Sequence, residues 1–201
     1  DTTSETNNVQ KFTKNGTFVT SWNISRITDD PFTNARGIGI DSLNNVYVTG
    51  GASTNTAVQK FTNNGTFVSS WGSTGLGDGE FTSPAWVTID SADNVYVGDF
   101  GENNRIQKFD SNGTFISKWG GPGTSDGQFV NPAGLVVDSS DNIYVADRGN
   151  NRVQKFDSNG TFITKWGTSG AGDGQFKLPA GLGVDTSGNI LVADAGNDRI
   201  Q

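Results

Sequence analysis

Residues 142–166 read NIYVADRGNNRVQKFDSNGTFITKW, and this stretch determines the expected fold. Apolar and polar residues alternate in three short runs, which is typical of β-strands. The last two runs are separated by Asn159 and Gly160. Asn-Gly between alternating runs predicts a tight hairpin, since both residue types tolerate positive φ. The stretch therefore predicts consecutive antiparallel strands.

The segment around this stretch completes a four-stranded unit. A Gly-rich link over 167–176 leads to an apolar run at 181–185, and a polar turn leads to another at 189–194. No segment keeps an apolar period of 3.6 residues, so we expect no helix. A lone four-stranded sheet cannot bury both faces, whereas sheets stacked around an axis can.

The same unit recurs along the chain. Its Val/Ile-Gln-Lys-Phe signature starts at 9, 58, 106 and 153, and a truncated copy ends the sequence at Ile200 and Gln201. A period of 47–49 residues suits a four-stranded propeller blade. We therefore predict an all-β fold, a β-propeller of four-stranded antiparallel blades. Residues 1–8 form an N-terminal extension, and residues 9–201 hold about four blades.

The composition of the chain argues against several classes of partner and of catalysis. The 201 residues include 14 Lys+Arg and 21 Asp+Glu, giving a net charge of −7 that repels nucleic-acid phosphate and anionic lipid. We expect no nucleic-acid partner and no membrane insertion. The sequence has no Cys, no Met and no His. This excludes thiolate nucleophiles, His-based acid–base catalysis and the usual zinc or haem ligands. We expect no cofactor, no metal and no catalytic residue.

The units at 142–156 and 189–201, and the GQFVNP motif at 127–132, resemble NHL repeats. The resemblance covers essentially residues 8–201 and implies a propeller, most often six-bladed. The chain starts with an outer hairpin at 9–22 and ends with an inner hairpin at 181–194. These two hairpins could pair to form a closing blade. However, Arg199, Ile200 and Gln201 begin another outer strand, which residues 9–12 already supply. We therefore favour a part of a larger ring over a closed four-blade ring.

Acidic and basic residues bracket one loop of each later unit. The pairs are Asp99 with Arg105, Asp147 with Arg152, and Asp194 with Arg199. The first full unit lacks both members, with Gly50 and Ala57 in their places. Because the Asp and the Arg are lost together in this unit, we expect the two side chains to contact each other in the other units. We therefore predict structural ion pairs, and an acidic ligand site is the alternative. The Gly-Asp-Gly links supply one carboxylate each, too few for calcium, and are interpreted as tight turns.

Four positions differ between units that otherwise match. Trp86 stands where other units have Gly37, Gly134 and Gly181, and Arg36 stands where they have Ala. Phe100 and Arg148 occupy matching places in a loop on the same face of the expected propeller. These four residues are the candidate ligand- or partner-binding surface, and drift in exposed loops is the alternative.

Five Asn-x-Ser/Thr sequons are candidate glycosylation sites, four of them at the expected Asn-Gly turns: Asn15, Asn23, Asn64, Asn112 and Asn159. The hairpin itself also demands Asn-Gly, so the pattern has a structural explanation as well. Glycosylation would require an extracellular location.

Two functions follow as hypotheses. The first is a non-catalytic extracellular or cell-surface scaffold that interacts with a protein or glycan, such as a subunit of a surface layer, sheath or filament. It could associate with itself through its end blades. The alternative, implied by the resemblance, is a fragment of an NHL-type propeller lyase whose catalytic residues lie in blades outside this sequence.

Overall fold

The structure of the chain, a computed structural model, describes residues 8–24, 33–51 and 57–201. It is an all-β propeller whose strands pair in antiparallel blades. The strands are β1 (Asn8–Phe12), β2 (Phe18–Asn23), β3 (Thr33–Ile40), β4 (Val46–Gly51), β5 (Val58–Phe61), β6 (Phe67–Trp71), β7 (Ser73–Thr74), β8 (Glu80–Phe81), β9 (Pro84–Ile89), β10 (Val95–Asp99), β11 (Arg105–Phe109), β12 (Phe115–Gly120), β13 (Pro132–Val137), β14 (Ile143–Asp147), β15 (Arg152–Phe156), β16 (Phe162–Trp166), β17 (Pro179–Val184), β18 (Ile190–Asp194) and β19 (Arg199–Ile200).

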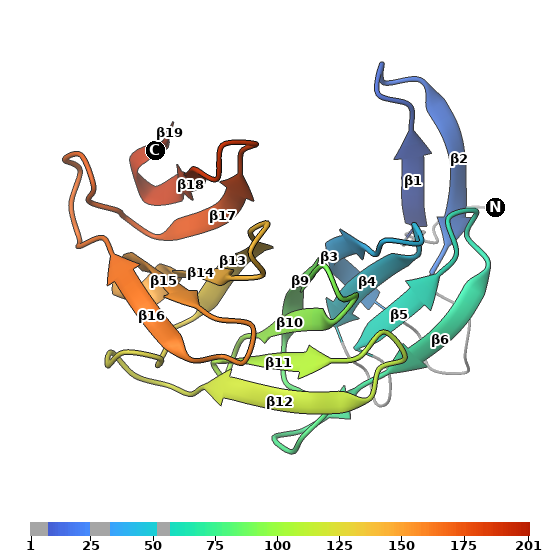
Figure 1. Cartoon of the computed structure of the whole chain (residues 1–201), viewed down its shortest axis with the longest axis horizontal. Helices are drawn as coiled ribbons and strands as arrows, with labels where there is room; N and C mark the ends of the chain where they lie inside the picture. The colour runs from blue at the N-terminus through green and yellow to red at the C-terminus, as the bar shows by residue number, and fades with distance from the viewer. Residues whose placement is uncertain (1–7, 25–32, 52–56) are drawn as a thin grey trace.

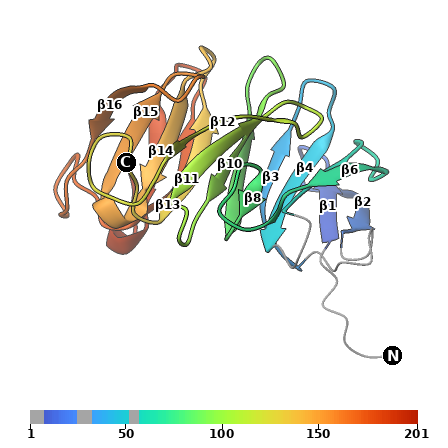
Figure 2. The same cartoon turned by 90° about the horizontal axis from the view of Figure 1, so that it is seen from below.

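Three blades have four strands each: β3–β6, β9–β12 and β13–β16. Strands β17, β18 and β19 form a three-stranded sheet, and β1 pairs with β2 in a separate hairpin. In Figure 1 the blades lie side by side along an arc, with β9 and β13 towards its centre and β12 and β16 at the rim. The β1–β2 hairpin lies at one end of the arc and β17–β19 at the other. Figure 2 shows the same stack from the side.

The helical content of the described part is limited to two three-residue 3₁₀ turns, η1 (Arg148–Asn150) and η2 (Ala195–Asn197). Both follow the second strand of a blade, within the loop that leads to the third. In the described segments no helix is long and apolar enough to cross a membrane.

The outer hairpins differ in detail from the sequence-based expectation. Gly16, Gly65, Gly113 and Gly160 have positive φ, but the Asn residues before them do not. Each of these Gly N–H groups donates to the carbonyl three residues earlier, and the strand register shifts beside the turn. The connection is thus a four-residue turn followed by a Gly bulge, not a two-residue turn with two positive φ values.

Apolar clusters between neighbouring blades hold the stack together. One cluster joins β3–β6 to β9–β12 through Tyr47, Val87 and Phe109, and another joins β9–β12 to β13–β16 through Tyr96, Phe129 and Phe156. The outer-strand Trp residues pack against these clusters. A Cβ at Gly113 would lie 2.5 Å from the Trp71 ring, so the turn of one blade fits closely against the Trp of the blade before it.

Candidate functional site

The loop after β14 is fixed by a buried ionic network. Asp147 is fully buried and Arg152 nearly so. Arg152 Nε lies 2.7 Å from Asp147 Oδ2, and the guanidinium donates to the carbonyls of Thr124, Ser125 and Gln128. Asp147 also accepts the N–H of Val130 at 2.8 Å. The pair thus fastens its own loop and the Gly-rich link that leads into the blade.

The equivalent Asp–Arg pairs of two other blades bind the corresponding carbonyls of their own links, but their Arg–Asp distances differ. Arg199 Nε lies 2.9 Å from Asp194, whereas Arg105 Nε lies 3.6 Å from Asp99. Burial raises the pKa of Asp99 above its usual value despite opposing hydrogen bonds. Burial opposes ionisation of Asp194 too, but the Lys177 N–H and the Asn197 and Arg199 side chains lower its pKa to about 2.

The blade β3–β6 lacks this network. Gly50 and Ala57 take the places of the Asp and Arg, and the Gly50 N–H still donates to the Ala57 carbonyl at 3.2 Å. The Gln59 side chain is fully buried, and neither of its amide atoms has a hydrogen-bond partner within the described ranges. The link that precedes this blade, 25–32, lies outside those ranges, as does the 52–56 part of its longer loop.

A second polar network lies at the turn between the first and second strands of each complete blade. Asp41 Oδ1 accepts the N–H groups of Leu43 and Asn45, as expected for an Asp before a polar turn. Its other oxygen accepts the Tyr47 hydroxyl, and Lys60 Nζ lies 3.6 Å away. Burial would raise the pKa of Asp41, but these hydrogen bonds and the Lys60 ammonium lower it.

Lys60 also joins neighbouring blades. Its ammonium donates to the Ser111 carbonyl on the next blade at 3.0 Å and lies 4.9 Å from the centre of the Tyr47 ring. Lys108 repeats the arrangement with Asp90, Tyr96 and Ser158. These recurring charged residues therefore serve to hold the blades together.

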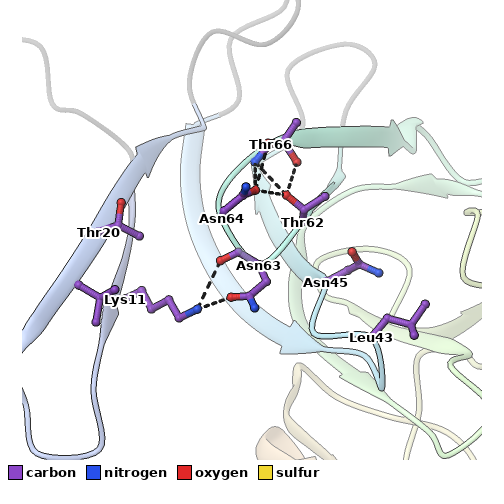
Figure 3. A pocket seen from close by; sticks show the side chains of 9 residues that line it. Lys11, Thr20, Leu43, Asn45, Thr62, Asn63, Asn64 and Thr66 are labelled. Atoms are coloured by element: carbon purple, nitrogen blue, oxygen red, sulfur yellow. Dashed lines mark hydrogen bonds between the residues drawn. The ribbon is translucent and has the colours of Figure 1, made fainter.

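A groove of about 690 Å³ opens between the β1–β2 hairpin and the turn of the next blade (Figure 3). Lys11 reaches across it from β1 and donates to the Asn63 side chain. Thr62 and Thr66 donate their hydroxyls to Asn64 on the same turn. Lys11 corresponds to Lys60, yet it has no carboxylate partner in the described part of the chain. Lys11 was not among the predicted site residues, although the sequence shows it at the repeat position of Lys60.

Two of the predicted binding residues contact neighbouring elements. Arg36 is exposed and donates to the Ser83 hydroxyl of the next blade at 2.8 Å. Trp86 is half-buried and packs against the cluster between its own blade and the next. It pairs across the sheet with Gly98, whereas in β3–β6 the pair is Gly37 with Thr49. The large residue on one strand is thus compensated by a small one on the next, a signal that the sequence contained.

The other two binding candidates lie in equivalent loops. Phe100 is half-buried, and its N–H donates to the Ser83 carbonyl at 3.0 Å. Arg148 is exposed at the start of η1, and its side chain has no hydrogen bond or ion pair within the described residues. Arg36 and Phe100 therefore meet at Ser83, while Arg148 lies on the next blade. We call these three residues the loop face.

The remaining candidates lie elsewhere. All five sequon Asn residues are exposed, four of them at the rim turns. The link carboxylates Asp78 and Asp126 are exposed and pair with Lys118 and Lys165 on the outer strands. Across the described ranges no three acidic residues gather as a metal site would require.

A family model supports the repeat assignment. The NHL repeat model matches residues 81–109, 129–156 and 176–201, which are the three segments from β8 to β11, from before β13 to β15 and from before β17 to the last residue. These segments are NHL repeats. Each segment contains the Asp and Arg of one of the three pairs described above, so the recurring charged residues of the NHL pattern here coincide with those that fasten the links.

Solved structures share the fold. A catalytically inactive His-to-Ala variant of virginiamycin B lyase from Staphylococcus aureus, with quinupristin, has a TM-score of 0.68 at 15% identity; the match covers 98% of this chain and 62% of that one. A nidogen/laminin complex gives 0.66 at 20% identity, covering 96% and 68%. A Bacteroides thetaiotaomicron protein of unknown function gives 0.65 at 17%, covering 83% and 46%. No curated protein sequence matches the chain.

These similarities establish the propeller fold alone, because all three identities are below 25%. The chain also spans only about three fifths of the lyase structure.

Proposed function

We propose that the chain is a non-catalytic interaction module of the extracellular space or cell surface, which binds a protein or glycan through the loop face. One observation carries the proposal. The buried charged groups of the complete blades are engaged in the two structural networks, while Arg148 on the loop face is exposed and outside them. A free, exposed guanidinium favours recognition over catalysis.

The structural neighbours contribute support of two kinds. The nidogen structure is a complex with laminin, so a similar propeller binds another protein. The inactive lyase carries an Ala in place of a His, whereas this sequence contains no His at all. The exposed sequons agree with an extracellular location.

The binding experiment uses laminin and a glycan array as probes. We expect one of them to bind the wild-type chain and to lose binding on Phe100→Ala with Arg148→Ala. Lys14→Ala is the matched control, because Lys14 is an exposed cation in the turn between β1 and β2 and is not part of the loop face. Absence of binding to every probe, or unchanged binding by the loop-face variant, would contradict the proposal.

The rival function is a lyase fragment, whose support is the propeller fold shared with virginiamycin B lyase at a TM-score of 0.68 and 15% identity. Quinupristin binding discriminates the two functions, because a lyase fragment that lacks its catalytic residues could bind the compound but could not convert it. We expect no binding of quinupristin to the chain in isothermal titration calorimetry. Saturable binding would favour the lyase fragment and contradict the proposal.

A further inference from the structure

Cations without a carboxylate partner gather on one face of this acidic protein. Within the described ranges eight Lys and Arg residues form ion pairs with carboxylates. The other described cations are Lys11 and Lys14 of the β1–β2 hairpin, and Arg36, Arg148 and Lys177. The last three lie beside the loops that contain Phe100, η1 and η2. A chain with a net charge of −7 therefore keeps three cations on this face that can attract an anion.

Two of these cations meet at the junction between β13–β16 and the next blade. Arg148 begins η1, and its carbonyl accepts the N–H of Asn151, the residue after this turn, at 3.3 Å. Asn151 Oδ1 in turn accepts the N–H of Leu178, on the link to the next blade, at 2.8 Å. Lys177 precedes Leu178, and its stem lies over Gly196, where a Cβ would be 2.6 Å from the Lys177 Cγ. Hydrogen bonds and close packing thus hold a guanidinium, an ammonium and the Leu178 side chain in one neighbourhood.

Leu178 departs from the local rules of the repeat. Its φ is 51°, in the left-handed region, where the equivalent residues of two other units are Asn34 and Asn131 with φ of 53° and 49°. Asn adopts this region at a lower cost than Leu does. The Leu178 side chain is also 38% exposed. An apolar residue that is strained in its backbone and open to solvent adds little to folding, and such strained residues cluster where proteins hold ligands.

We propose that Arg148, Lys177 and Leu178, which we call the junction site, bind an acidic segment of a partner protein. Carboxylates of the segment pair with the two cations, and an apolar side chain of the segment packs on Leu178. A peptide fits this site better than an acidic glycan does, because Leu178 offers an aliphatic contact and no aromatic plane for a sugar ring. The inference rests on the proposed function, since Arg148 belongs to the loop face, and it specifies the chemistry of the partner.

The charge requirement is tested with a labelled short synthetic peptide of Glu residues around one central Leu, followed by fluorescence anisotropy. We expect saturable binding to the wild-type chain that weakens with added salt. Arg148→Ala combined with Lys177→Ala is expected to bind about tenfold more weakly. Lys11→Ala combined with Lys14→Ala removes the same charge from the β1–β2 hairpin and is expected to bind as the wild type does. Asp198→Asn removes an exposed carboxylate from the loop that contains Gly196, so it is expected to bind more tightly.

Leu178→Asn separates binding from folding. Asn occupies the equivalent positions 34 and 131, and the hydrogen bond to Asn151 is kept because the backbone N–H donates it. We expect a thermal midpoint no lower than that of the wild type, and binding of the peptide weaker by about threefold. A peptide with Ser in place of the central Leu is expected to bind the wild type and Leu178→Asn equally, since it has no apolar side chain to place on Leu178.

Heparin, an anionic glycan, is the competing probe. Binding of heparin without binding of the Glu peptide would assign the junction site to a glycan and overturn the proposal. Unchanged peptide binding by the Arg148→Ala, Lys177→Ala chain or by Leu178→Asn would overturn it as well. If the peptide fails to bind while laminin or a glycan binds through Phe100 and Arg148, this inference is wrong and the proposed function stands. If none of these probes binds, both are wrong.

Discussion

The blades β13–β16 and β3–β6 have the same strand order and similar strand lengths, but only the first has the Asp147–Arg152 network. In β3–β6 the β4–β5 pairing persists from Val46 to Thr49 without it. Strand alternation and apolar packing are therefore sufficient for the sheet, and the ionic network has a different task. It fastens the Gly-rich link and the loop at the end of the blade.

The largest effect is expected when the network of β13–β16 is broken. Arg152→Ala leaves Asp147 as a buried carboxylate without its cation and frees three link carbonyls. We expect the free energy of unfolding to fall by about 3–5 kcal/mol. Urea denaturation measures this loss. Arg148→Ala, on the adjacent exposed loop, is the control and is expected to change it by less than about 0.5 kcal/mol.

A smaller effect is expected at Trp86, where the blades differ in packing rather than in charge. Trp86→Ala removes a half-buried ring beside Gly98 and the cluster around Phe129, and we expect a loss of about 2–3 kcal/mol. Gly98→Ala is the matched variant. Its new Cβ would lie 3.7 Å from the nearest atom, so little change is expected. An unchanged stability of Trp86→Ala would show that the ring is free for a ligand.

Acidic pH is expected to separate Asp194 from Asp99. The pKa of Asp194 is lowered to about 2 from 3.8, so its contribution is present above 3.8 and is lost as the pH falls towards 2. The pKa of Asp99 is raised, so protonation of this group favours the folded state as the pH falls. Urea denaturation of the wild type, Asp194→Asn and Asp99→Asn at a series of pH values measures both contributions. If the free energy of unfolding changed equally with pH in the two variants, the opposite pKa shifts of Asp194 and Asp99 would be contradicted.

Much of the fold was visible in the sequence because the repeat carries it. The alternation around Val153 and the spacing of the signature predicted the strands and the blade stack, and the joint absence at Gly50 and Ala57 pointed to a pair in contact. The predicted conformation of the Asn159–Gly160 turn was wrong, because an Asn-Gly sequence is compatible both with a two-residue turn and with a turn that has a Gly bulge. Only backbone geometry separates these alternatives.

The candidate sites were harder to predict, since residue type does not specify direction. Trp86 differs from its equivalents and was therefore predicted to bind a ligand or partner. In the structure it pairs with Gly98, and its half-buried ring packs against the cluster around Phe129, while the binding role stays a prediction. Lys11 shares a motif with Lys60 and was grouped with it. Lys11 donates to Asn63 instead of pairing with a carboxylate, as Lys60 does. This difference depends on which strands lie beside β1, which the sequence around Lys11 does not specify.

The most direct test of the account is a double-mutant cycle that converts β13–β16 into the likeness of β3–β6. Asp147→Gly, Arg152→Ala and the combined variant are unfolded in urea, and the coupling between the two substitutions is taken from the three losses. We predict a coupling of at least about 2 kcal/mol, so that the double variant loses far less than the sum of the single ones. If the losses in free energy of unfolding were additive, the claim that Asp147 and Arg152 stabilise the loop as one coupled pair would be contradicted.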